Sequence, residues 1–451
     1  MRNEWHNLLW LPPPPADFAA LCKVVVPADG DALRRLSGYQ LNDLQLTRLA
    51  RICVSFTAPP PGFESFRLAI LGNGNSEFAA GALKASALRY GVWLETHIEG
   101  LGQTATAALD PANALYEFNP SAVLLSLTYH VLPAFTPGNN DALEALKGEV
   151  ILIRDSLRQN GNIPLIVQTI PQAPVSIFGS IDRRTVGTVR QQVAAFNDWL
   201  FTTDMAVLDV AALAETAGLA SWHNNGQWHW AKLPFAQNLL PLYADYVARF
   251  IGALRGRSRK CLVLDLDNTL WGGVIGDDGL EGIELGQGSP RGEAFLAIQQ
   301  MALALRTRGI VLAVCSKNDD GNARLPFREH PEQLLREEHI AVFQANWNDK
   351  ASNLEAIARA LDLTPEALVF LDDNPAERDI VRRELPAVAV PEIPMDEPAL
   401  WPMILSAAGY FESVAFTDAD IDRVTQYASN AQRESLKVKS RDIGDYLKEL
   451  G

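Results

Sequence analysis

A short apolar run that ends in two closely spaced aspartates constrains this chain more than any other feature. Residues 262–264 read Leu-Val-Leu, and Asp265 and Asp267 stand just beyond them. Carboxylates two residues apart on an extended chain lie on the same side, about 7 Å apart. Two like charges this close at the end of a buried strand are costly unless a cation or a proton neutralises them. Because Mg²⁺ binds one or two carboxylates together with phosphate oxygens, the pattern favours a magnesium site for a phosphorylated substrate.

Three further polar clusters follow in the chain. Two later apolar runs end in Ser316 and in the pair Asp372–Asp373, and Lys350 stands directly before a helical pattern. Apolar strands that alternate with helical patterns predict an α/β fold with a doubly wound parallel sheet, in which ligands bind at the carboxyl ends of the strands. We therefore expect these clusters to meet at one edge of the sheet.

The order of the four clusters resembles the motifs of the haloacid dehalogenase (HAD) superfamily, which are DxDxT, Ser or Thr, Lys and a paired acid. The resemblance and the chemistry together assign Asp265 as the nucleophile and Asp267 as the general acid and base. They also imply that Thr269, Ser316 and Lys350 bind phosphoryl oxygens and offset charge in the transition state.

The implied cofactor is Mg²⁺. Its predicted ligands are Asp265, the backbone of Asp267, and either Asp372 or Asp373. The sequence does not decide which member of the last pair contacts the metal.

Residues 260–274, 314–319 and 371–378 narrow the resemblance to the FkbH-like family, with a match that runs from about Arg259 to Phe411. Members of that family are associated with polyketide assembly. They dephosphorylate 1,3-bisphosphoglycerate and transfer its glyceryl group to the phosphopantetheine thiol of an acyl carrier protein. The resemblance implies this substrate and this partner for the chain. A simple Mg²⁺-dependent phosphatase and an interaction scaffold are the alternatives.

Cys315 directly precedes the phosphate-binding Ser316 and is the candidate acyl acceptor. A thiolate at this position could take the acyl group from an acyl phosphate as a thioester, and a nearby Lys317 and the metal would lower the thiol pKa. The alternatives are a cysteine that only packs in the core and direct attack by the carrier's own thiol.

The segments between the motifs are too short for a lid domain of ordinary size, and residues 274–292 are predicted to form a flap. Such a minimally capped site suits the arm of a carrier protein, and it suits a protein phosphatase equally. Because carrier proteins are acidic, Arg378, Arg382 and Arg383 are candidates for a basic docking surface, and a solvated helix face is the alternative.

Residues 1–255 are predicted to form a separate α/β domain around a second parallel sheet. The expected strands lie at 68–71, 122–127, 165–169 and 206–210, and expected helices at 78–90 and 188–201. The loops at 72–76 and 100–103 resemble those of SGNH hydrolases, which FkbH-like proteins often carry as an N-terminal domain.

The catalytic motifs of that hydrolase group are incomplete here. Its nucleophile belongs to a Gly-Asp-Ser turn, whereas the matching turn reads Gly72-Asn73-Gly74, and a closing Asp-x-x-His is missing. We therefore expect a non-hydrolytic docking or dimerisation module, in which His223 and His229 have structural roles.

Composition limits the remaining possibilities. At 451 residues the chain is long enough for two or three domains, and we expect parts at 1–255, 256–411 and 412–451, the last a helical extension. A net charge of −15 argues against nucleic-acid binding. The four cysteines lack metal-ligand spacing and no apolar run reaches membrane-spanning length, so we expect a cytoplasmic protein that does not bind membranes.

Overall fold

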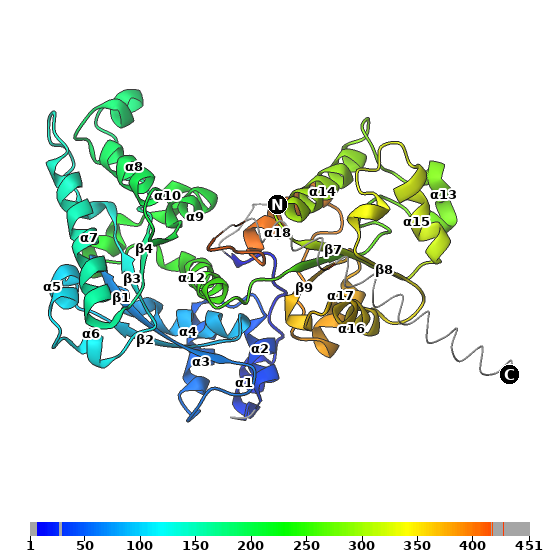
Figure 1. Cartoon of the computed structure of the whole chain (residues 1–451), viewed down its shortest axis with the longest axis horizontal. Helices are drawn as coiled ribbons and strands as arrows, with labels where there is room; N and C mark the ends of the chain where they lie inside the picture. Colours follow the sequence, from blue (N-terminus) through cyan, green and yellow to red (C-terminus); the bar gives the residue numbers. More distant parts are fainter. Residues whose placement is uncertain (1–6, 27–28, 416, 418–426, 428–451) are drawn as a thin grey trace. The chain divides into compact units, whose positions relative to one another are not determined.

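The computed structural model describes residues 7–26, 29–415, 417 and 427. The chain divides into two compact units (Figure 1). The first comprises residues 1–8 and 13–252, and the second comprises residues 9–12 and 253–451. The helical extension predicted for 412–451 lies almost wholly outside the described residues.

The first unit is built on a five-stranded parallel sheet with the order β2-β1-β3-β4-β5. Its strands are β1 (Glu64–Gly72), β2 (Val92–Ile98), β3 (Ala122–Ser126), β4 (Leu165–Gln168) and β5 (Ala206–Leu208). The central strand β3 is buried along its whole length, and it lies within one continuous apolar cluster.

Helices precede, connect and follow the strands of this first sheet, and the fourth to the eighth of them form the crossovers between strands. They are α1 (Phe18–Val24), α2 (Gly30–Ser37), α3 (Asp43–Cys53), α4 (Ala80–Arg89), α5 (Thr104–Leu109), α6 (Ala114–Glu117), α7 (Asp141–Gly161), α8 (Val189–Leu200), α9 (Val210–Ala217), α10 (Leu219–Trp222), α11 (Asn225–Ala231) and α12 (Leu240–Leu254). Parallel strands need such crossovers, because the chain must return to the same end of the sheet.

The second unit contains a four-stranded parallel sheet with the order β8-β7-β6-β9. Its strands are β6 (Cys261–Leu264), β7 (Val311–Ser316), β8 (Val342–Ala345) and β9 (Leu368–Leu371). Its helices are α13 (Ile275–Gly282), α14 (Pro290–Thr307), α15 (Asp320–Glu329), α16 (Lys350–Leu361), α17 (Pro375–Glu384) and α18 (Trp401–Ala408). The prediction of two parallel-sheet α/β units is confirmed.

The register of the second sheet aligns the ends of its strands. Leu264 of β6 pairs with Val314 of β7 on one side and with Leu371 of β9 on the other. The residues that follow each strand therefore emerge at the same edge. In this unit α14 lies on one side of the sheet, and α16 and α17 lie on the other (Figure 1).

No helix within the described residues combines the length and apolar character needed to cross a membrane.

Candidate active site

The four predicted polar clusters meet in one open pocket at the carboxyl edge of the second sheet. Asp265 and Asp267 follow β6, Ser316 ends β7, and Lys350 begins α16. These four side chains line the pocket together with Lys317, Asn268, Asp372, Asp373, Asn374, Glu377 and Met395. The expectation that residues from four separate segments converge is thus met by the geometry.

Lys350 is the cation at the centre of the site. Its Nζ lies 2.5 Å from Asp265 Oδ1 and 3.1 Å from Asp372 Oδ2, and it donates to the Cys315 carbonyl oxygen at 2.8 Å. Burial alone would lower the pKa of this ammonium, but the carboxylates of Asp265 and Asp372 raise it above its ordinary value. The two carboxylates therefore stabilise the charged form of Lys350, and Asp349 caps the start of the helix α16 that carries it.

Three carboxylates form an acidic cluster beside this lysine. Oxygens of Asp265, Asp372 and Asp373 all lie within 4.8 Å of one another. Burial, and then the charge of Asp265, raises the pKa of Asp372 to about 7 and that of Asp373 to about 6. The structure thus brings both members of the final acidic pair to the place where the sequence predicted a metal.

The cluster fits a hard divalent cation. Its donors are all carboxylate oxygens, and the Asp372 side chain is almost wholly buried. Asp372 Oδ2 has the Lys350 ammonium 3.1 Å away, yet the three carboxylates still exceed the single lysine in charge. A cation at this position would supply the missing positive charge.

Arg378 holds the backbone that carries the acidic pair. Its guanidinium is buried and donates to the carbonyl oxygens of Asp372 and Asp373 at 2.8 and 2.7 Å, and to Glu392 at 2.9 Å. The prediction that Arg378 belongs to an exposed docking surface is therefore wrong. Arg382 also forms an ion pair with Glu392, whereas the Arg383 side chain is 70% exposed and forms an ion pair with the neighbouring Glu384.

Thr269 has a different position from the one predicted. Its side chain is fully buried, and its hydroxyl accepts a hydrogen bond from the Asp373 amide at 3.2 Å. It does not line the pocket, so the prediction that it binds a phosphoryl group is not supported. Thr269 instead ties the loop after β6 to the loop after β9.

Cys315 lies on the core side of β7. It belongs to the apolar cluster that includes Val311 and Ala313 of the same strand and Leu354 and Ile357 of α16. The side chain is completely buried, and burial raises the thiol pKa to about 12. The expectation of a lowered thiol pKa is wrong for the protein without metal. The apolar surroundings raise the thiol pKa by more than the charge of Lys350 lowers it.

Asp267 lies outside the acidic cluster, and its carboxylate is half-buried. Burial raises its pKa above the ordinary value, while hydrogen bonds from the Ile275 amide and the Trp271 indole act in the opposite direction. A carboxyl group whose pKa is raised holds a proton more readily than a free one, which is the direction that its predicted role as general acid requires.

The pocket has no separate lid domain among the described residues. Between β6 and β7 the structure has only α13, α14 and their connecting loops, so the predicted flap contains the short helix α13. Access to the site is accordingly open.

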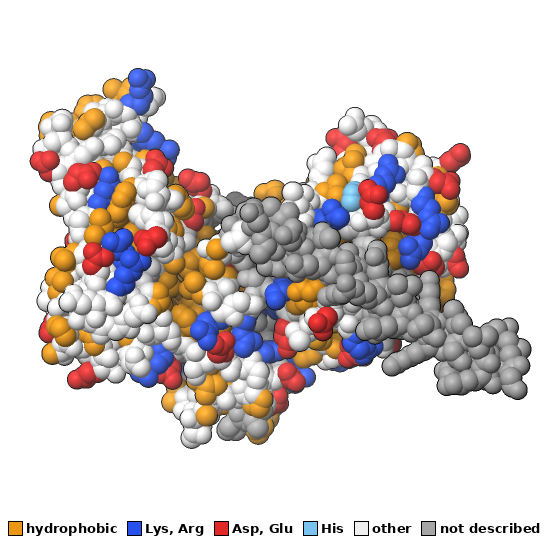
Figure 2. Space-filling model, in the orientation of Figure 1, with side chains coloured by type: hydrophobic (Ala, Val, Ile, Leu, Met, Phe, Trp, Pro, Cys, Tyr) orange, Lys and Arg blue, Asp and Glu red, His pale blue; other side chains and the backbone are white. Residues whose placement is uncertain are grey.

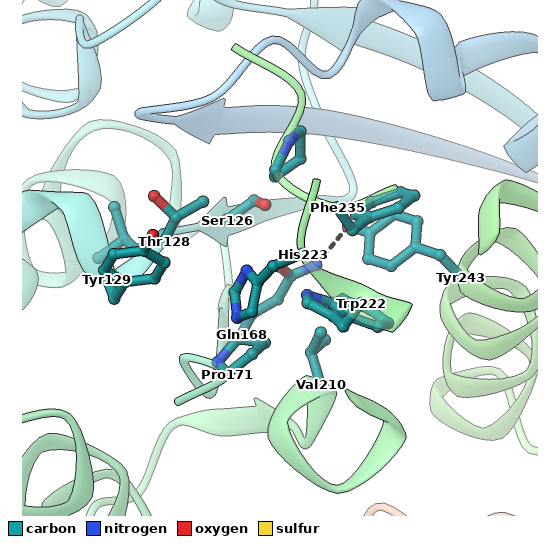
Figure 3. Close-up of a pocket in the computed structure, with 12 residues that line it drawn as sticks. Ser126, Thr128, Tyr129, Gln168, Pro171, Val210, Trp222, His223, Phe235 and Tyr243 are labelled. Atoms are coloured by element: carbon teal, nitrogen blue, oxygen red, sulfur yellow. Dashed lines mark hydrogen bonds between the residues drawn. The ribbon is translucent and has the colours of Figure 1, made fainter. Parts of the chain in front are cut away.

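A second pocket lies at the carboxyl edge of the first sheet (Figure 3). Aromatic rings of Tyr129, Trp222, Phe235 and Tyr243 line it, and Gln168 donates a hydrogen bond to the Tyr243 hydroxyl. The loop at 72–76, which resembles that of SGNH hydrolases, follows β1 at this edge.

The residues at that edge bond to one another. Asn73 Nδ2 donates to Thr128 Oγ1 at 2.9 Å, and the Thr128 amide donates to Asn73 Oδ1 at 2.8 Å. His223 Nε2 lies 2.8 Å from the Gln172 carbonyl oxygen, and burial lowers the pKa of this imidazole. His229, by contrast, is exposed.

Sequence reasoning missed two side chains that contact Asp267. Trp271 donates from its indole at 3.0 Å, and Asn318 donates from its amide at 2.9 Å. Both lie in segments that were singled out for their family resemblance, but neither residue type marks a catalytic role by itself. Their position within the motifs was the only available signal.

Comparison with solved structures gives a match over most of the chain. No family model matches the chain, and no curated protein matches it. A solved structure of the N-terminal part of the protein BF1531 from Bacteroides fragilis, described as containing a phosphatase domain complexed with Mg, is 29% identical. The match covers 83% of this chain and 100% of that chain with a TM-score of 0.74.

A second solved structure, a gut microbial diltiazem-metabolizing enzyme, is 8% identical over 46% of this chain and 50% of that chain. Its TM-score of 0.30 supports no conclusion. Taken with the acidic cluster, the first match is consistent with a HAD-like phosphatase whose cofactor is Mg²⁺.

Proposed function

We propose that this chain is a Mg²⁺-dependent HAD-type phosphatase with its active site in the second unit. The observation that carries the proposal is the contact between Lys350 and Asp265 beside the acidic cluster. The lysine neutralises one oxygen of the nucleophilic carboxylate and leaves the other oxygen to attack phosphorus. The similarity to a phosphatase domain that binds Mg supports the same reaction class.

The reaction divides into two steps on the chain's own residues. An oxygen of Asp265 forms a bond to phosphorus while the bond from phosphorus to the leaving group breaks, and Asp267 supplies a proton to the leaving oxygen. Water then attacks the aspartyl phosphate, Asp267 takes a proton from it, and Asp265 is regenerated. Ser316 and Lys350 bind the phosphoryl oxygens throughout.

Asp265, Asp372 and Asp373 would hold the Mg²⁺ ion, and the backbone of Asp267 stays a predicted ligand. When bound, the ion would offset negative charge on the phosphoryl oxygens and on the carboxylates.

Acyl transfer is the finer part of the proposal. We infer from the resemblance to FkbH-like proteins that the substrate is 1,3-bisphosphoglycerate and that the glyceryl group passes to the thiol of an acyl carrier protein. The burial of Cys315 favours direct attack by the carrier thiol on the acyl phosphate carbonyl. The bond from sulfur to the carbonyl carbon forms, the bond from that carbon to the phosphate oxygen breaks, and inorganic phosphate leaves with the thiol proton. Asp265 and Asp267 remove the other phosphate by the two steps described above. The open pocket is compatible with a long carrier arm.

On the face in view, acidic and basic side chains are interspersed (Figure 2). An acidic carrier would dock against local cations of the second unit. Exposed Arg383 and Lys317, which is ion-paired with Glu377 at the pocket, are the candidates.

We propose that the first unit is a non-hydrolytic docking or dimerisation module. In the turn that matches Gly-Asp-Ser of the SGNH hydrolases, Asn73 occupies the position of the aspartate and Gly74 that of the serine. The Asn73 side chain is hydrogen-bonded to Thr128. A direct check is hydrolysis of short acyl esters such as p-nitrophenyl acetate, for which no turnover above background is expected.

Intact-protein mass spectrometry separates the candidate activities. The full chain is incubated with 1,3-bisphosphoglycerate, Mg²⁺ and a holo-carrier, alongside Cys315→Ala. Carrier loading that persists in Cys315→Ala supports direct attack, whereas a glyceryl adduct that vanishes in Cys315→Ala supports the thioester route. Release of free phosphate without any carrier loading would support the phosphatase activity and contradict the transferase activity.

A further inference from the structure

The two oxygens of Asp267 have different surroundings. Oδ1 accepts hydrogen bonds from Trp271 Nε1 and from the Ile275 amide, both at 3.0 Å. Oδ2 accepts one hydrogen bond, from Asn318 Nδ2 at 2.9 Å. Because a carboxylate oxygen has two lone pairs, both lone pairs of Oδ1 are occupied and one lone pair of Oδ2 is left.

The donors to Oδ1 are fixed by packing and by a tight turn. The Trp271 side chain is fully buried and packs edge-on against Phe327, with 6.1 Å between the centroids of the two rings. Ile275 begins α13, directly after a turn in which Gly273 has a φ of 92°. A side chain at Gly273 would be strained in that conformation and would meet Asp278 Oδ2 at 2.6 Å, so the turn that delivers the Ile275 amide requires glycine.

The donor to Oδ2 is oriented independently, from the other side. Asn318 is 5% exposed, and its Oδ1 accepts a hydrogen bond from the Asp319 amide at 3.1 Å. That bond sets which end of the amide faces Asp267, so Nδ2 and not Oδ1 points to the carboxylate. Asp319 in turn caps α15 by accepting from the amides of Gly321 and Asn322.

We propose that Asn318 and Trp271 are positioning residues that present Oδ2 of Asp267 as the proton-transferring atom of the phosphatase reaction. The proposal rests on the proposed function above. As the bond from Asp265 to phosphorus forms and the bond to the leaving group breaks, the proton passes from Oδ2 to the leaving-group oxygen. The resulting carboxylate retains its hydrogen bond from Asn318, and Oδ1 retains both of its own.

Leaving groups of different basicity test this role. An alkyl phosphate needs a proton on its departing oxygen, whereas p-nitrophenolate leaves as a stable anion. The parameter kcat/KM reports only the steps through loss of the leaving group, so it isolates the acid function of Asp267 from its later function as a base. Wild type, Asn318→Leu and Trp271→Phe are compared on glycerol 3-phosphate and on p-nitrophenyl phosphate with Mg²⁺.

We expect kcat/KM for the alkyl phosphate to fall about 100-fold in Asn318→Leu and less in Trp271→Phe, where the Ile275 amide still holds Oδ1. The value for p-nitrophenyl phosphate should change by no more than about threefold. Asn322→Leu, a matched change at an exposed position of α15, should alter neither value. In an Asp267→Asn background, Asn318→Leu should cause no further loss, because it acts only through Asp267.

Equal losses on both substrates, or none on either, would overturn the positioning role while leaving the phosphatase intact. A further loss in the Asp267→Asn background would do the same. If wild-type protein turned over neither substrate, the phosphatase proposal itself would fail, and this inference with it.

Discussion

At the scale of single residues, Lys350 determines how the charges of the site balance. One ammonium contacts two of three clustered carboxylates, so the site has both a neutralised nucleophile and an uncompensated negative charge. The first property suits attack on phosphorus, and the second suits a divalent cation.

Asp265→Asn is expected to abolish turnover, by a factor on the order of 10⁴ or more, because an amide oxygen does not form the phosphoenzyme. The variant should remain folded, since it removes one of three mutually repelling carboxylates. Phosphate release with Mg²⁺ measures the effect. Persistent turnover would show that another group is the nucleophile.

Arg378→Met is expected to destabilise the protein by about 1–3 kcal/mol, because the carbonyl oxygens of Asp372 and Asp373 would lose their buried donor. Arg383→Met, on the same helix but exposed, serves as the control and should change stability by less than about 0.5 kcal/mol. Urea unfolding measures both. Equal effects would mean that the guanidinium does not support the acidic loop.

At the scale of elements, burial decided which strands could be predicted. The runs that became β6, β7 and β9 are buried throughout and stand out as uninterrupted apolar stretches. Two strands missing from the prediction, β2 and β8, lie at sheet edges and have half-exposed side chains. Their mixed polarity gives no clear period, so only pairing with a neighbour identifies them as strands.

Side-chain direction limited the prediction of the site in the same way. The motifs identify Asp265, Ser316 and Lys350 because their chemistry and their place after strands agree. Thr269 and Cys315 belong to the same motifs, yet the backbone turns both away from the pocket. Cys315 still pairs with Gln344 within β7 and faces the core, whereas Thr269 lies beyond the end of β6, where strand alternation no longer predicts the direction of a side chain.

Strand β7 should protect Cys315 from thiol reagents in the folded protein. Iodoacetamide is expected to label half-exposed Cys53 before Cys315, and Cys315 no faster than buried Cys261 of the neighbouring strand. Peptide mass spectrometry after a timed reaction gives the order. Early labelling of Cys315 would show that β7 opens readily, and would support acyl transfer through a thioester on Cys315.

At the scale of the whole molecule, the acidic cluster links stability to pH and to metal. Folding raises the pKa of Asp372 to about 7 and that of Asp373 to about 6, so the metal-free folded state binds protons more tightly than the unfolded chain. The stability that these groups contribute is present at low pH and is lost as pH rises through these values.

Excess Mg²⁺ should therefore raise the melting temperature more at about pH 8 than at about pH 5, because protons compete for the same oxygens. Asp372→Asn in EDTA should be more stable than wild type at the higher pH and gain less from Mg²⁺. Differential scanning fluorimetry measures the melting temperature of both proteins at each pH, once with Mg²⁺ and once with EDTA. A larger Mg²⁺ effect at the lower pH would place the ion elsewhere.

Trp10 has a consequence for how the chain reaches its native state. It is 1% exposed, it belongs with the second unit although most of the first unit follows it in the chain, and its carbonyl oxygen accepts a hydrogen bond from the Glu392 amide. During synthesis Trp10 emerges before every strand of both sheets, whereas Glu392 emerges only after the last of them. Closing so long a loop is slow, so the second unit should finish folding only after the ribosome has released most of the chain.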